Sequence, residues 1–218
     1  MLDLARNNCN ALQNSEGSAM TAKPGRPPRA AKDIKRMRDK IAEQAMQIFQ
    51  QDGFDALSIR RLAREVGCSP MTIYAHFDGK PEILRHLWGA VLGQVFAKIA
   101  EQLQGVEAPE LRLRLAAQCF VAHWLEHPDQ FRMVFMSSGV VRSDVASFMS
   151  GAATIGHFQT FMDLVAQTSV PKGEVKIRTE ALIMGMIGVA LSCNTIRDYP
   201  WGDPAEITDI MVAGVLRA

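Results

Sequence analysis

Hydrogen-bonding side chains are concentrated in the segment VGCSPMTIYAHFDGK, residues 66–80. Thr72, Tyr74 and His76 fall within about two helical turns, and Lys80 follows directly after Gly79. Hydroxyl, imidazole and ammonium groups of this kind bond to phosphate oxygens. A helix this short is unstable alone, so neighbouring helices must hold these side chains in place.

The residues before this segment predict those neighbouring helices. Ser58 is a typical N-cap, and apolar residues follow it at i, i+3, i+4 and i+7 over residues 59–66. Gly67 suits the positive φ of a tight turn, after which Ser69 caps the short third helix. With a first helix over residues 33–51, the pattern predicts a helix-turn-helix, although an ordinary αα-hairpin has similar spacing.

The third helix presents two distinct faces. At about 100° per residue, Ile73 points inward, Met71 and Ala75 lie on the opposite side, and Thr72 and Tyr74 lie on the flanks. Apolar groups at the centre of the outer face suit thymine methyls, and hydroxyls at its edges suit phosphates. The face therefore predicts a helix that enters a DNA major groove. Two alternatives stay open, a half-buried packing role for the tyrosine and an ordinary surface role for the histidine.

Positive charge is concentrated near the N-terminus. Residues 1–80 carry a net charge of +4 and residues 81–218 a net charge of −3, with a local +6 over residues 23–40. This distribution suggests a polyanionic partner for the N-terminal part only. Residues 1–32 are predicted to be a disordered basic arm, in which Arg26 could enter a minor groove. A solubilising tail without contacts is the alternative.

Residues 81–218 predict a larger helical body, so the fold class is all-α with about nine helices in total. Prolines mark several helix starts, where they are tolerated. The predicted helices cover residues 81–104, 109–126, 128–137, 144–168, 174–198 and 204–217. The apolar stretch 181–196 is shorter than the roughly 20 residues that span a bilayer, and it is predicted to be a buried core helix.

Large apolar residues in this body make a ligand pocket possible, although most of them must simply form the core. Methionines adapt to irregular ligands, and Cys119 and His123 are polar members of an apolar segment that could orient a ligand or form a satisfied buried pair. The predicted ligand-binding residues are Cys119, His123, Trp124, Met136, Phe158, Met162 and Met184.

Residues 33–84 resemble the DNA-binding domain of TetR-family transcriptional regulators. The resemblance rests on IAEQAMQIFQQDGFDALSIRRLAREVGCSPMTIYAHFDGKPEIL, above all on TIYAHFDGK. It implies DNA contacts at Ser58, Thr72, Tyr74, His76 and Lys80. The full predicted contact set adds Arg26, Ser69 and Met71.

The rest of the chain is similar to the family over a shorter segment, FVAHWLEHPDQFRMVFM. The resemblance implies a ligand-binding and dimerisation domain over residues 81–218 and a homodimer formed by the last two helices. Small residues such as Gly185 and Gly188 would allow those helices to approach closely. The third helix of one copy would then lie about 34–36 Å from the third helix of the other copy. This separation would match a palindromic operator.

The function predicted from sequence is a ligand-responsive dimeric repressor, released from double-stranded DNA by a small apolar ligand. Activation by the ligand and DNA binding without any ligand are the alternatives. No paired nucleophile and base, metal-ligand spacing or phosphate loop is visible, so we expect no enzyme, cofactor or metal. The four scattered cysteines and the absence of an apolar leader predict a cytoplasmic, nucleoid-associated protein without a membrane segment.

Overall fold

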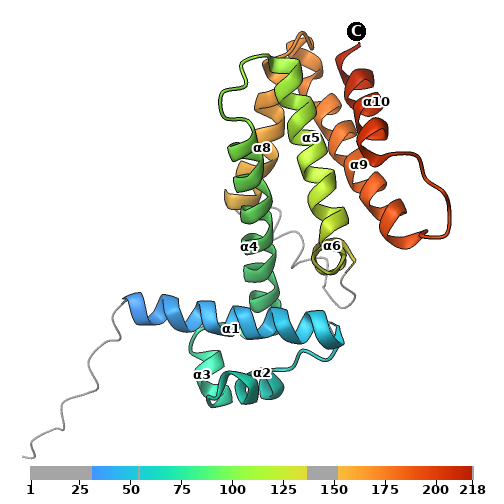
Figure 1. Cartoon of the computed structure of the whole chain (residues 1–218). Coiled ribbons are helices and arrows are strands. Elements are labelled where there is room, and N and C mark those ends of the chain that lie inside the picture. The colour runs from blue at the N-terminus through green and yellow to red at the C-terminus, as the bar shows by residue number, and fades with distance from the viewer. Residues whose placement is uncertain (1–30, 54, 137–151, 218) are drawn as a thin grey trace, which may run out of the picture.

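The fold is all-α, as the sequence predicts. The computed structural model describes residues 31–53, 55–136 and 152–217. This part of the chain contains nine α-helices, one short 3₁₀-helix and no strand. Figure 1 shows a small unit of three helices below an upright bundle that holds the remaining helices.

The small unit is formed by α1 (Ala31–Asp52), α2 (Ile59–Val66) and α3 (Pro70–Tyr74). Its core is apolar and fully enclosed, and it includes Ile41, Leu62 and Ile73, each 0% exposed. The predicted three-helix arrangement is therefore present. The first helix begins at Ala31, so its first two residues fall in the segment predicted as the basic arm.

The upright bundle contains the other helices. They are α4 (Gly79–Gln102), α5 (Pro109–Glu126), α6 (Pro128–Phe135), α8 (Ala152–Ala166), the 3₁₀-helix η1 (Lys172–Glu174), α9 (Val175–Thr195) and α10 (Pro204–Leu216). The central helix is α5, which packs against α4, α8, α9 and α10. The predicted helices are confirmed within a few residues, and residues 144–151 lie outside the described residues.

Helix α4 connects the two parts of the molecule. It begins beside α1 and runs upward into the bundle (Figure 1). The predicted domain boundary after residue 80 therefore falls within the first turn of this helix, which starts at Gly79. A displacement of α4 in the bundle would reach the three-helix unit directly.

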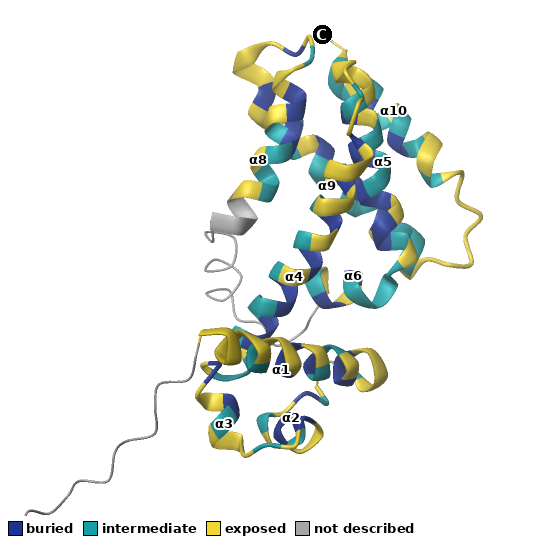
Figure 2. Ribbon diagram, turned by 60° about the vertical axis from the view of Figure 1, so that its left-hand side comes forward, coloured by how far each residue is buried: buried dark blue, intermediate teal, exposed yellow. Residues whose placement is uncertain are grey.

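Aromatic residues fill the lower half of the bundle core. Trp88 of α4 donates its indole N–H to the carbonyl oxygen of Met133 in α6 at 2.8 Å. Trp124 of α5 is 0% exposed, and its ring lies against Phe120 and Phe135. Figure 2 shows buried residues where these helices meet. These contacts hold α4, α5 and α6 together as one packed core.

Helix α9 departs from the buried core helix predicted for residues 181–196. Leu182, Met186 and Ala190 face the bundle, but Met184 is 72% exposed and Leu191 is 40% exposed. One side of this apolar helix is therefore uncovered in the single chain. No helix in the described ranges is long and apolar enough to cross a membrane.

Gly185 of α9 faces the side chain of Met211 in α10. A Cβ atom at this position would overlap the terminal methyl group of Met211 in α10. Gly185 therefore lies against α10 of the same chain. Its predicted role in the approach of a second chain stays a prediction.

Candidate nucleic-acid interface

The turn between α2 and α3 has the helix cap and the positive φ that the sequence predicts. The hydroxyl of Ser58 accepts a hydrogen bond from the Arg61 N–H at 3.2 Å and caps α2. Gly67 ends α2 with a φ of 75°, and the N–H of Cys68 donates to the Ala63 carbonyl oxygen at 2.9 Å. This arrangement closes the helix and turns the chain sharply toward α3.

Replacing Gly67 with alanine should lower the free energy of unfolding by about 1–2 kcal/mol, because a Cβ atom disfavours the left-handed backbone conformation. Urea unfolding of the full chain measures this effect. Gly93→Ala is the matched control, since residue 93 lies inside α4 without a positive φ and with open space around it. Equal stability of the Gly67→Ala variant and the wild type would contradict the role assigned to this turn.

Two hydroxyl groups shape the start of α3. The Ser69 hydroxyl accepts a hydrogen bond from the Thr72 N–H at 3.1 Å, and the two side-chain oxygens lie 3.0 Å apart. Pro70 occupies the first helical position. Both hydroxyls are thus engaged in capping, so any contact with DNA must use their remaining hydrogen-bonding capacity or the threonine methyl group.

The exposed face of α3 has the predicted orientation. Ile73 and Phe77 are 0% and 1% exposed and fix the helix to the core. On the other side, Met71 is 74% exposed and Tyr74 is 54% exposed, and Ala75 is exposed as well. A thioether and a phenol held outward on a rigid helix are available to contact a groove and its phosphates.

Lys80, at the start of α4, interacts electrostatically with Asp55, which precedes α2. Lys80 is the second residue of α4 and is half-buried, and burial lowers the pKa of its amine while the carboxylate of Asp55 acts in the opposite direction. Asp55 lies three residues before the exposed Ser58. The predicted DNA contacts at Ser58 and Lys80 stay predictions.

His76 does not fit the predicted phosphate contact. Its side chain is 7% exposed, because it follows Ile73 by three positions and remains on the side that faces the core. Its backbone carbonyl oxygen accepts a hydrogen bond from Arg38. The remaining predicted residue, Arg26, lies outside the described residues.

Two basic residues of α1 support the site without having been predicted. The Lys40 amine donates to the carbonyl oxygen of Val66 at 2.9 Å, at the last turn of α2. Arg38 forms an ion pair with Glu82 of α4, with 2.9 Å between Nη2 and Oε1. These partners are 26 and 44 residues apart in the chain, so no short-range pattern could have indicated them.

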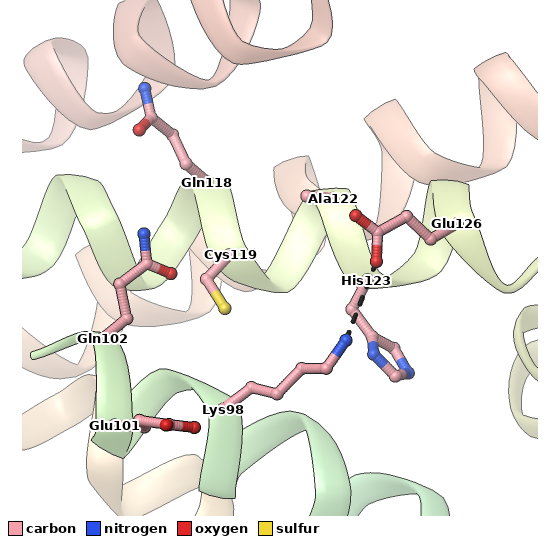
Figure 3. A pocket seen from close by; sticks show the side chains of 8 residues that line it. All are labelled: Lys98, Glu101, Gln102, Gln118, Cys119, Ala122, His123 and Glu126. Carbon is pink, nitrogen blue, oxygen red and sulfur yellow. Dashed lines mark ion pairs between the residues drawn. The ribbon is translucent and has the colours of Figure 1, made fainter.

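Of the predicted ligand-binding residues, Cys119 and His123 line one cleft. Its volume is about 480 Å³, and it lies between α4 and α5. Figure 3 shows the Cys119 sulfur and the Lys98 amine on the side of α5 that faces α4, where the Lys98 Nζ lies 3.7 Å from Glu126 Oε2. Burial raises the pKa of the Cys119 thiol and lowers that of the His123 imidazole. Most of the lining side chains end in a polar group, whereas the sequence predicts an apolar pocket.

The other predicted ligand-binding residues are dispersed. Met184 is 72% exposed on the outer side of α9, which contradicts a pocket role, and Met136 is 46% exposed at the end of α6. Phe158 and Met162 are half-buried on α8. Trp124 is fully buried, and its indole N–H has no hydrogen-bond partner in the described part of the chain. The seven residues therefore do not form a single pocket.

In the described ranges, no group of three or more His, Cys, Asp or Glu side chains is placed to hold a metal ion. A small three-helix unit with an exposed, capped third helix on a helical bundle is the architecture of a helix-turn-helix protein that binds DNA.

Comparisons with known proteins agree with this class. Residues 41–87 match the model of the bacterial regulatory proteins of the tetR family. The HTH-type transcriptional activator FasR of Mycolicibacterium smegmatis is 24% identical over 174 residues, which cover 79% of this chain and 76% of FasR. The HTH-type transcriptional repressor DrrR1 of Streptomyces coeruleorubidus is 39% identical over 59 residues, which cover 27% of this chain and only 22% of DrrR1.

Solved structures share this fold. The fatty acid degradation regulator FadR from Bacillus halodurans superposes with a TM-score of 0.66 at 14% identity, covering 83% of this chain and 94% of FadR. Residues 41–87 thus match the tetR-family model over the helix-turn-helix, and the chain is a DNA-binding transcriptional regulator.

Proposed function

We propose that the chain acts as a homodimeric repressor that binds a palindromic operator through α3. The observation that carries this proposal is the outward face of α3, with Met71 74% exposed and Tyr74 54% exposed on a helix fixed by buried Ile73. The proposed contact set is Met71, Thr72 and Tyr74 on α3, with Ser58, Ser69 and Lys80 at the helix starts. His76 is omitted because its side chain is buried.

The proposed homodimer uses the uncovered side of α9 and α10. Ile177, Met184 and Leu191 lie seven residues apart along α9 and are 63%, 72% and 40% exposed, while Ile210 of α10 is 72% exposed. Residues spaced by seven form one stripe on a helix. Burying such a stripe against a second copy removes apolar surface from water, which favours association.

The proposed domain organisation assigns DNA binding to residues 33–80 and ligand binding and dimerisation to residues 81–218, with residues 1–32 as a basic arm. The ligand would be small and mainly apolar, and it would carry one hydrogen-bond acceptor. Support comes from Trp124, whose buried indole N–H lies among aromatic rings and has no hydrogen-bond partner in the described ranges. A buried donor without a partner costs about 1–3 kcal/mol. The relatives are named as regulators, so we assign no catalytic role and place the chain at the nucleoid in the cytoplasm.

Selection from random duplex DNA with the full chain tests the proposal. We expect enriched sequences to be palindromes whose half-sites are centred about one helical turn apart, or a multiple of it. Enrichment of single half-sites without symmetry would contradict dimeric binding, and no enrichment at low salt would contradict the proposed contacts of α3.

A second candidate is activation, favoured by FasR, which is named an activator and matches over 76% of its length. A reporter gene placed behind the selected operator separates the two modes. Repression predicts higher expression when the regulator is deleted, whereas activation predicts lower expression.

A further inference from the structure

The guanidinium group of Arg38 contacts three separate parts of the three-helix unit and its junction with α4. It donates a hydrogen bond to the carbonyl oxygen of His76, and it pairs with the Glu82 carboxylate at 2.9 Å. Its central carbon also lies 4.1 Å from the centre of the Phe77 ring, in a cation–π geometry. One side chain of α1 thus holds both the segment that follows α3 and the first turns of α4.

The partners of Arg38 are themselves held together. The second carboxylate oxygen of Glu82 accepts a hydrogen bond from the Asp78 N–H, immediately before α4. The ring of His86, one turn further along α4, meets the Phe77 ring edge-on at 5.4 Å. The junction from residue 76 to residue 86 is therefore a connected network around one guanidinium group.

This network lies at the junction between α3 and α4. Helix α3 has only five residues, and Ile73 is its only buried residue. The segment between α3 and α4 is short, and α4 continues into the bundle (Figure 1). The network around Arg38 therefore joins the segment that directly follows α3 to the first turns of α4.

We propose that Arg38 is a positioning residue that sets the angle between α3 and α4, and thereby the separation of the two α3 helices in the dimer. This inference rests on the proposed dimeric binding. A helix pair held at a fixed separation accepts one half-site spacing and rejects others. Arg38 therefore controls discrimination between spacings without reading any base.

Operators of different spacing test this role directly. Insertion of one base pair between the half-sites of the selected operator shifts one half-site by roughly 3.4 Å and turns it by about 35°. The affinity of the full chain is measured for both duplexes with wild type, Arg38→Met and Arg38→Lys. Arg36→Met is the matched control, because it removes the same charge from an exposed position of the same helix.

We expect wild type and the Arg36→Met control to prefer the selected spacing by at least about 10-fold, and Arg38→Met to prefer it by only about two- to threefold. Arg38→Lys should fall between them, since lysine keeps the charge but cannot bond to several groups in a fixed fork. A merely structural role would lower both affinities equally and leave their ratio unchanged, which would overturn the inference.

Two further outcomes also decide against Arg38 as a positioning residue. If Arg38→Met lowers the slope of log affinity against log salt by about one, the guanidinium contacts a phosphate instead. If wild type itself shows no preference for spacing, the proposed dimer fails together with the inference. Circular dichroism checks that each variant is folded. If Arg38→Met is unfolded, the ratio for Glu82→Gln, which keeps the shape of the partner without its charge, decides.

Discussion

Replacing Tyr74 and Lys80 together with alanine is expected to lower affinity for the selected operator about 100-fold at a fixed salt concentration. Tyr74 is 54% exposed on the outer face of α3, and Lys80 follows at the start of α4. Each contact with a phosphate or base contributes about 1–3 kcal/mol. Loss of the amine should also reduce the slope of log affinity against log salt by about one.

A gel-shift titration at two salt concentrations measures both quantities. The chain offers a matched control, Tyr199→Ala with Lys172→Ala, because Tyr199 is the second tyrosine of the chain and is 57% exposed in the bundle. Equal losses in the two double variants would show that α3 is not the contact surface. Thermal unfolding of each variant verifies that Ile73 still anchors the helix.

Charge placed on the uncovered side of α9 and α10 should have an effect of similar or larger size. Met184 and Ile210 are each 72% exposed, so Met184→Glu with Ile210→Glu leaves the core of the single chain intact. In the proposed dimer these carboxylates would be buried and close to one another, and the two chains should separate. Because two linked half-site contacts raise affinity by roughly 10²–10⁴, operator affinity should fall by that factor.

Sedimentation equilibrium together with operator titration checks this second prediction. Leu111→Glu serves as the control, since Leu111 is an exposed apolar residue of α5 with 44% exposure. If the double variant remains dimeric, the interface does not lie on this side of α9 and α10, and the proposed interface is wrong. A variant that becomes monomeric and still binds the operator with undiminished affinity would contradict the need for two copies.

The sequence predicted the three-helix unit well because its signals are local. Ser58, Gly67 and Ser69 each specify a cap or a turn through their own backbone preferences, and the helical period places Ile73 inward. The same period also places His76, three positions after Ile73, on the side that faces the core. His76 lies just beyond the last residue of α3, where the chain bends toward α4 and takes the imidazole into the core.

Two features could not be derived from sequence for a physical reason. The network joins Arg38 to partners that lie 38 and 44 positions further along the chain. Such long-range polar contacts leave no periodic pattern in the sequence. In α9, the apolar residues that would contact a proposed second copy are of the same types as those that face the core. Their types in the sequence therefore do not distinguish the two surfaces. Met184 is predicted in a pocket because methionine adapts to irregular ligands, but the structure leaves it exposed.

Binding of the full chain to its selected duplex, in competition with excess shuffled duplex at two salt concentrations, tests the central claim most directly. The account predicts a discrete complex that survives the competitor and weakens several-fold at the higher salt concentration. Equal affinity for selected and shuffled duplexes, or no complex at low salt, would contradict sequence-specific binding through α3.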